Sequence, residues 1–209
     1  MFQFLLKMVS HQVTFIILAT VQALMVSEDV IKNLQKRAVE KGANSTKVIA
    51  VKDVFVEDWV RQKCEYGCNG YARHFTCPPY SPTPEETRSR LRGYNKALLV
   101  EFAEKEETEG RRTVNEVMFE LEREAFLNGL HKAFSYGAGP CDICETCPAE
   151  EVENPSKYSK RECKNQEEAR PAMEACGIDV FQTARKAGYE IHCVRENEPH
   201  KNFGLLLLE

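Results

Sequence analysis

The sequence predicts an α/β or α+β fold: one layered domain with a mixed sheet and cysteine-rich insertions at the strand ends. Amphipathic helical patterns alternate with short apolar runs along the chain, which is typical of helices that pack on a sheet. The chain has 209 residues, of which 43% are hydrophobic and 29% are charged. That length and composition suit a single globular domain with a sizeable buried core.

The N-terminal segment differs from the rest of the chain. Residues 1–24 contain a short apolar run at positions 13–19, which is too short to span a bilayer. We expect residues 1–24 to be an upstream extension, with the functional start at Met25. The alternative is a targeting segment of the secretory type, since Lys7 precedes the apolar run. Residues 25–209 then form the domain.

Helix starts and apolar runs give the expected elements. Ser27 can cap a helix that ends near Gly42, and Thr83 with Pro84 can start another that reaches about Arg92. The other helical patterns cover residues 57–62, 113–132, 171–176 and 179–187, the last capped by Asp179. Strand patterns cover residues 47–51, 96–102, 133–136, 189–194 and 203–208. We expect the last two strands to pair with each other, and residues 104–112 to form a charged connector.

Three cysteines at three-residue steps, Cys141, Cys144 and Cys147, are the strongest chemical signal in the chain, and Cys163 follows them. Such steps let the chain wrap one small object with every sulfur pointing inward. Iron–sulfur clusters are held by runs of this kind, with the remaining thiolate supplied from farther along the chain. Zinc sites more often use two separated cysteine or histidine pairs. We favour a 4Fe–4S cluster over zinc, and a metal over disulfides or free thiols.

A second group, Cys64, Cys68 and Cys77, precedes the main run at wider spacings. It supplies only three sulfurs, so a metal held there keeps a fourth position for water, a small ligand or a side chain such as His74. Buried thiols in a loop-rich segment are the alternative interpretation. A swapped assignment is also open, because in two-cluster ferredoxins the cysteine of a Cys-Pro pair binds the other cluster, and both Cys77 and Cys147 precede proline.

Charge argues against a nucleic-acid partner. The formal net charge is −4, and the pI is about 5.8, without the basic footprint of a DNA- or RNA-binding protein. The segment 142–174 holds nine acidic and five basic residues, which makes the surroundings of the main run acidic. The nine cysteines are odd in number and gather at ligand-like spacings, which favours metal binding in a reducing cytoplasm over a disulfide framework. We expect no membrane association.

Three stretches of the chain together carry a recognisable pattern: Cys77-Pro-Pro-Tyr-Ser-Pro-Thr-Pro-Glu-Glu, Gly139-Pro-Cys-Asp-Ile-Cys-Glu-Thr-Cys-Pro and Arg170-Pro-Ala-Met-Glu-Ala-Cys-Gly-Ile-Asp-Val. In these stretches the chain resembles the prokaryotic predicted metal-binding proteins called domain of unknown function 2284. The resemblance runs from about Val26 to the C-terminus. It implies metal or iron–sulfur binding through Cys64, Cys68, Cys77, Cys141, Cys144, Cys147 and Cys163, but no defined reaction.

Three residues depart from that family pattern or lie outside it. Ala172 stands where serine is expected, which removes any role for a hydroxyl group at that position. Cys176 and Cys193 fall outside the cysteine pattern, and we interpret both as small buried apolar residues.

The functional expectation is a metal-binding, iron–sulfur protein with one 4Fe–4S cluster or two. It acts in electron transfer or in the redox activation of a partner protein. A zinc-stabilised regulatory module without chemistry is the alternative. No Gly-rich phosphate loop is present, since Gly137-Ala-Gly139-Pro140 lacks the lysine and the hydroxyl residue of a P-loop.

Overall fold

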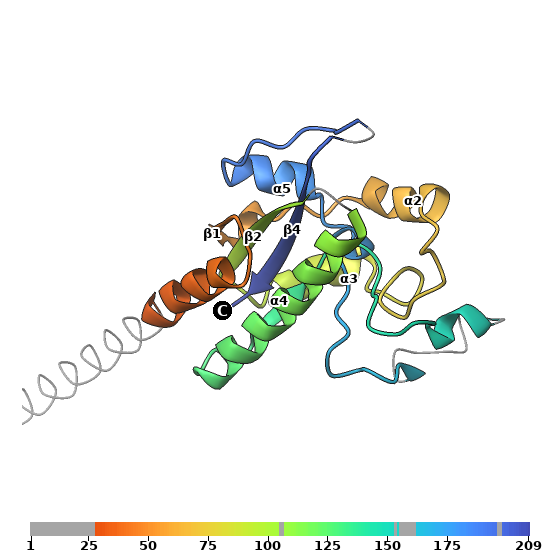
Figure 1. The fold of residues 1–209 in the computed structure, drawn as a ribbon, viewed down its shortest axis with the longest axis horizontal. Coiled ribbons are helices and arrows are strands. Elements are labelled where there is room, and N and C mark those ends of the chain that lie inside the picture. Colours follow the sequence, from red (N-terminus) through yellow and green to blue (C-terminus); the bar gives the residue numbers. More distant parts are fainter. Residues whose placement is uncertain (1–27, 105–106, 153, 155–161, 196–197) are drawn as a thin grey trace, which may run out of the picture.

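The computed structural model describes residues 28–104, 107–152, 154, 162–195 and 198–209 and arranges them in three layers. A four-stranded sheet in the order β1-β2-β4-β3 forms the middle layer, and helices cover both of its faces (Figure 1). The strands are β1 (Ser45–Ala50), β2 (Lys96–Glu104), β3 (Phe134–Tyr136) and β4 (His200–Leu207). The helices are residues 28–40, α2 (Asp58–Gly67), α3 (Pro84–Leu91), α4 (Glu107–Leu127) and α5 (Val180–Lys186). The predicted single layered domain of helices and strands is therefore confirmed.

The strand pairings are antiparallel throughout the sheet. Among the described residues, the parallel pairing of the expected mixed sheet is limited to an isolated bridge between Gly137 and Ala172. That bridge lies directly after β3, where the chain enters the main cysteine run. It therefore matters more for the cysteines than for the sheet.

Both faces of the two central strands are buried, which explains their unbroken apolar sequences. On β2, Leu98 and Val100 face one helical layer, while Leu99 faces the other. On β4, Leu206 and Leu205 divide in the same way, and all five of these side chains are fully buried. Alternate residues of a strand point to opposite faces, so a strand covered on both sides needs apolar residues at every position.

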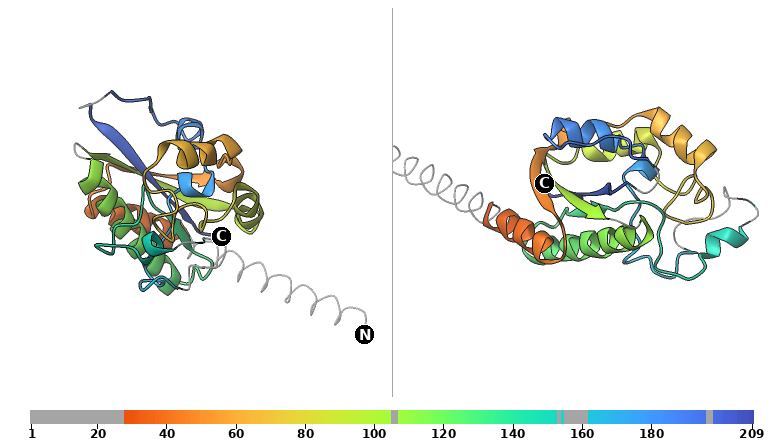
Figure 2. Two further views of the ribbon diagram at one scale, coloured as in Figure 1. Left: turned by 90° about the vertical axis from the view of Figure 1, so that its right-hand side faces the viewer. Right: turned by 45° about the horizontal axis from the view of Figure 1, so that its top comes forward.

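The helix over residues 28–40 and α4 lie side by side on one face of the sheet (Figure 2). Their apolar side chains, among them Leu34 and Leu121, form a buried cluster with the sheet. α4 crosses β4 at Gly204, where a Cβ atom would collide with the Met118 side chain. Glycine at this position therefore permits the close approach of helix and strand.

α3 and α5 cover the opposite face, and their starts follow the sequence signals. The Thr83 hydroxyl accepts a hydrogen bond from the Glu86 N–H, and the Glu86 carboxylate accepts one from the Thr83 N–H, which forms a capping box. The Asp179 carboxylate accepts the Gln182 N–H at 2.9 Å and caps α5. The predicted caps at Thr83 and Asp179 are thus confirmed, whereas Ser27 and residues 1–24 lie outside the described part of the chain.

Three local predictions are wrong. Residues 107–112 are not a connector but the start of α4. The glutamate and arginine residues in this stretch have high helix propensity, although the stretch itself has no apolar stripe. The segment expected as a helix over 171–176 shortens to one 3₁₀ turn, Glu174–Cys176. Residues 189–194 form no strand, and β4 pairs with β2 and β3 instead.

The segment 189–194 avoids a ladder because side chains already bind its carbonyl groups. The Ile191 carbonyl accepts hydrogen bonds from the Arg185 guanidinium at 3.1 and 3.2 Å, and the Glu190 carbonyl accepts one from Lys201 at 2.8 Å. Tyr189 is buried against Phe203, with ring centroids 5.2 Å apart. The alternating pattern of residues 189–194 thus reflects side-chain packing against the sheet and not strand pairing.

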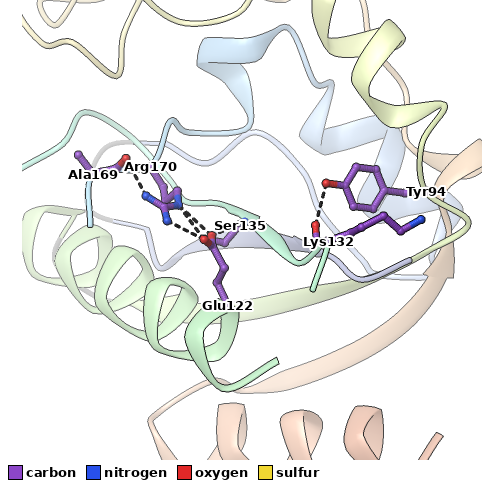
Figure 3. A network of polar contacts seen from close by, with 6 residues as sticks. All are labelled: Tyr94, Glu122, Lys132, Ser135, Ala169 and Arg170. Carbon is purple, nitrogen blue, oxygen red and sulfur yellow. Dashed lines mark hydrogen bonds and ion pairs between the residues drawn. The ribbon is translucent and has the colours of Figure 1, made fainter. Parts of the chain in front are cut away.

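A buried ion pair joins α4, β3 and the segment before residue 171 (Figure 3). The Arg170 guanidinium donates to both carboxylate oxygens of Glu122, at distances from 2.6 to 3.1 Å. The same carboxylate accepts the N–H and the hydroxyl of Ser135, each at 2.7 Å. The Arg170 guanidinium carbon also lies 5.5 Å from the ring centres of Phe119 and Phe134. We call Glu122, Ser135 and Arg170 the clip.

The clip closes the loop that carries the main cysteine run. Next to it, the Gly137 N–H donates to the Pro171 carbonyl at 3.0 Å, and the Met173 N–H donates to the Gly137 carbonyl at 3.1 Å. Both ends of the segment 138–170 are therefore fastened to each other and to α4. A nearby hydrogen bond, from the Tyr94 hydroxyl to the Lys132 carbonyl at 2.8 Å, holds the approach to β3 (Figure 3).

We predict that Glu122→Gln lowers the free energy of unfolding by about 3 kcal/mol, because it leaves the largely buried Arg170 charge without its counter-ion. The matched control is Glu124→Gln on the same helix. Glu124 pairs with Arg37 at 3.5 Å on the surface, so its loss should cost less than about 1 kcal/mol. Urea unfolding followed by circular dichroism measures both values, and equal losses would contradict the role given to the clip.

Candidate metal centre

The first cysteine group comes together at the C-terminal end of α2. Cys64 lies in the last turns of α2, Cys68 directly follows the helix, and Cys77 lies in the next turn of the chain. All three side chains line the same pocket. The structure therefore brings together the three cysteines that the sequence placed in one group.

Arg61 holds α2 in position for this group. Its guanidinium donates to the carbonyl groups of Pro82 and Ala175, each at 2.7 Å, and to the Ser81 hydroxyl at 3.0 Å. The Ser81 hydroxyl in turn donates to the Ala175 carbonyl at 2.7 Å. Because Cys64 lies three residues after Arg61, these contacts fix one side of the helix, and with it the Cys64 sulfur, against the segment 174–176.

Tight turns place the other two sulfurs. The Cys77 carbonyl accepts the N–H groups of Tyr80 and Ser81, both at 3.0 Å. The Gly70 N–H donates to the Cys68 sulfur at 3.4 Å. A Cβ atom at Gly70 would lie 3.1 Å from the Pro140 side chain, so this loop packs closely against the start of the main cysteine run.

The second group surrounds a separate, small cavity of about 10 Å³. Its walls include all four cysteines that the sequence assigned to one cluster, Cys141, Cys144, Cys147 and Cys163. Phe75, Ala149 and Ala169 pack around them and are almost fully buried. The Asn165 side-chain N–H donates to the Cys144 sulfur at 3.0 Å. The surroundings are thus apolar, with one amide directed at a sulfur.

The two groups share a wall. Gly139 and Pro140, which precede Cys141, line the pocket of the first group. Phe75 and Thr76, which precede Cys77, line the cavity of the second. Each of these two segments therefore contributes a cysteine to one group, while the two residues just before that cysteine line the site of the other group. Figure 1 shows the end of α2 and the loops that follow it gathered with the segments around 140–152 and 162–170 at one end of the sheet.

Burial opposes free thiolates at these sites. Burial, followed by the neighbouring Cys68 thiol, raises the pKa of Cys64 to about 11. Burial, followed by the Cys68 and Cys64 thiols, raises the pKa of Cys77 to about 12. Burial also raises the pKa of Cys141, although the Ile143 N–H opposes the shift. A thiolate in such a site needs a compensating cation, which is what a bound metal supplies.

Of the two remaining cysteines, only one is buried as predicted. Cys176 is fully buried in the core beside Ile178, as predicted, and burial raises its pKa to about 12. Cys193 is exposed, so its interpretation as a buried apolar residue is wrong. Neither lines the pocket or the cavity of the cysteine groups. All nine cysteines are free thiols, without a disulfide.

His74 does not line the pocket of the first group, although its carbonyl accepts the Cys77 N–H at 2.9 Å. Burial lowers the pKa of its imidazole, while the nearby Glu150 and Asp142 carboxylates oppose that shift. Those two residues lie on the segment of the main run, and His74 is not among the residues that line the pocket. Two other histidines, His192 and His200, do line it. The alternation of residues 189–194 predicts a strand, so the sequence pattern does not indicate that His192 lines a pocket.

The pocket extends well beyond the three sulfurs, with a volume of about 480 Å³. Its other walls come from α2, from the first turn of α5 and from residues 190–192, 194 and 199–203. Within the described residues, no three side chains of histidine, cysteine, aspartate or glutamate lie close enough together to hold a single metal ion between them. The seven cysteines thus remain predicted ligands, gathered in two adjacent groups of three and four.

We predict that Arg61→Met exposes the Cys77 thiol, because three buried oxygen atoms lose their charged donor and the contact of α2 with residues 81 and 175 opens. A charged hydrogen bond contributes about 1.5–3 kcal/mol, so the rate of Cys77 alkylation in metal-free protein should rise about tenfold or more. Arg73→Met is the matched control, since Arg73 is exposed in the same region. Peptide mass spectrometry measures each thiol, and an unchanged Cys77 rate would contradict this role of Arg61.

No helix in the described part of the chain has the length and apolar character needed to cross a bilayer.

Comparison with known proteins gives one match. No curated protein and no solved structure matches the chain. The model of the predicted metal-binding protein family DUF2284 matches residues 47–208, which include both cysteine groups. Because the match covers well over half of the sequence, the chain belongs to the DUF2284 family of predicted metal-binding proteins.

Proposed function

We propose that this protein is an iron–sulfur electron carrier that acts on a partner protein in a reducing cytoplasm. Cys141, Cys144, Cys147 and Cys163 hold a 4Fe–4S cluster, which exchanges one electron at a time. The observation that carries the proposal is that all four cysteines line one small cavity with apolar walls. Four cysteines complete the ligand set of such a cluster.

The donor set around the cavity supports iron–sulfur ligation. All four predicted ligands are sulfurs, the donors that such clusters require. The Asn165 N–H on the Cys144 sulfur is the kind of contact that stabilises a thiolate ligand and raises the cluster's reduction potential. The acidic residues nearby act in the opposite direction, because negative charge disfavours the reduced form. The chain thus contains two opposing means of setting the potential.

Cys64, Cys68 and Cys77 are proposed to hold a second metal centre. Three protein ligands leave one position free, and the pocket lies on the side to which that position can open. The shared wall of Gly139-Pro140 and Phe75-Thr76 keeps the two groups adjacent. An electron taken up at the four-cysteine group therefore has a short path to the three-cysteine group, where a small ligand or a partner cofactor is reduced.

We expect anaerobically purified protein to be brown and to contain iron and acid-labile sulfide. Cys144→Ser should lose most iron from the four-cysteine group and become more sensitive to protease, because metal binding contributes to folding. Cys193→Ser is the matched control and should keep full iron content, since Cys193 is exposed and lines neither the pocket nor the cavity.

Iron and sulfide assays with limited proteolysis measure these outcomes. Colourless protein with stoichiometric zinc would overturn the electron-carrier proposal in favour of a zinc-stabilised regulatory module. Equal behaviour of the two cysteine variants would overturn the division between ligand and other cysteines.

The second metal is tested separately with Cys77→Ala. Because Cys77 lines the pocket with Cys64 and Cys68, we expect this variant to lose the second metal and to keep an ordinary, fully coordinated 4Fe–4S cluster. If both sites hold clusters, the iron content falls to about half, given four irons in each. Electron paramagnetic resonance identifies the remaining cluster. Disturbance of the four-cysteine cluster would indicate the swapped assignment, and an unchanged metal content would show that Cys77 is not a ligand.

A further inference from the structure

The pocket beside Cys64, Cys68 and Cys77 is much larger than a metal site needs. Its volume of about 480 Å³ falls in the range of pockets that bind organic ligands, about 300–1,000 Å³. Its lining includes the three cysteines together with residues of β4 and of the segment 190–194. A metal bound at the sulfurs therefore fills only part of this space.

The rest of the pocket has apolar walls built from separate elements. Trp59 comes from α2, Phe181 from α5, Ile191 from the segment after α5 and Phe203 from β4. Trp59 is 48% exposed, although a side chain of its size and apolarity is usually more deeply buried. Its ring thus forms part of a wall that the protein's own core does not cover.

Charged groups in the lining are partly neutralised within the protein. The Lys201 ammonium lies 2.8 Å from a Glu101 carboxylate oxygen and 2.8 Å from the Glu190 carbonyl. The Asp179 carboxylate caps α5. Lys63 is exposed on α2. Glu174, Glu190, His192 and His200 also line the pocket, so the apolar body of a ligand is expected against the wall of Trp59, Phe181, Ile191 and Phe203 and not along the whole lining.

We propose that this pocket binds an uncharged nitrogen heterocycle that carries an apolar ring. The ring occupies the space between Trp59, Phe181 and Ile191, and the heterocycle nitrogen reaches the open position of the metal at Cys64, Cys68 and Cys77. A ring nitrogen is a suitable donor for either iron or zinc, so the ligand class does not depend on which metal is bound. The nitrogen contact rests on the proposed second metal, whereas binding of the apolar ring rests on the pocket alone.

The experiment compares imidazole with phenylimidazole, two probes that share a donor and differ by an apolar ring. Trp59 is the only tryptophan of the chain and lines the pocket, so its fluorescence reports occupancy directly. Metal content is measured first, and both probes are then titrated into metal-loaded and metal-stripped protein. The visible or electron paramagnetic resonance spectrum of the loaded protein reports contact with the metal.

We expect phenylimidazole to bind the loaded protein at least about tenfold more tightly than imidazole, a difference of about 1.4 kcal/mol. Phe181→Ala should remove most of this advantage and leave imidazole binding unchanged within about twofold, because it shortens only the apolar wall. Phe126→Ala is the matched control, since Phe126 is 57% exposed on α4 and does not line the pocket. Circular dichroism confirms that each variant is folded.

Each result decides one part of the proposal. Equal affinities of the two probes, or a Phe181→Ala variant indistinguishable from Phe126→Ala, would overturn the ligand pocket even if metal is bound. Trp59 quenching without a change in the metal spectrum would retain the pocket and overturn the nitrogen–metal contact. Absence of metal at the three cysteines would overturn the proposed second metal. Quenching of Trp59 fluorescence by phenylimidazole in that metal-free protein would still decide whether the pocket binds the apolar ring.

Discussion

The buried ion pair between Arg170 and Glu122 is the contact on which the arrangement of the cysteines depends. The segment 138–170 carries four cysteines, and its described residues contain little regular structure, so their backbone must be fixed from outside. Glu122 does this by binding Arg170 at the end of the segment and Ser135 just before its beginning. A charged pair is costly to bury, and it is tolerated here because the carboxylate's other contacts are satisfied too.

Arg61 performs the same task for the first cysteine group. It binds carbonyl groups of two segments that are distant in sequence, at residues 82 and 175. Each cysteine group is thus positioned by its own arginine, whose guanidinium binds several backbone or carboxylate oxygens. Five donors in a rigid planar arrangement make arginine well suited to joining loops that share no strand or helix. The sheet supplies the platform, and the two arginines attach the metal-binding loops to it.

Adjacency of the two groups gives the proposed function its physical sense. The closed, apolar surroundings of Cys163 and its neighbours suit a centre that exchanges electrons without binding substrate. The pocket beside Cys77 is open and lined by aromatic rings, as a site that receives a ligand requires. Because Pro140 packs on Gly70 between them, the structure joins a closed group to an open one over a short distance.

The sequence by itself determined the three- and four-cysteine grouping, the central strands and the caps of α3 and α5, because each depends on residues close together in the chain. Local spacing places Cys141, Cys144 and Cys147 around one object, and apolar runs specify strands buried on both faces. Only the tertiary structure decided that the groups share a wall, that the His74 side chain does not line the pocket, and that residues 190–192, 194 and 199–203 do. These features depend on contacts between segments about a hundred residues apart. Residues 189–194 alternate with the period of a strand. Arg185 and Lys201, however, donate hydrogen bonds to carbonyl groups of this segment, which lines the pocket and does not pair with a strand.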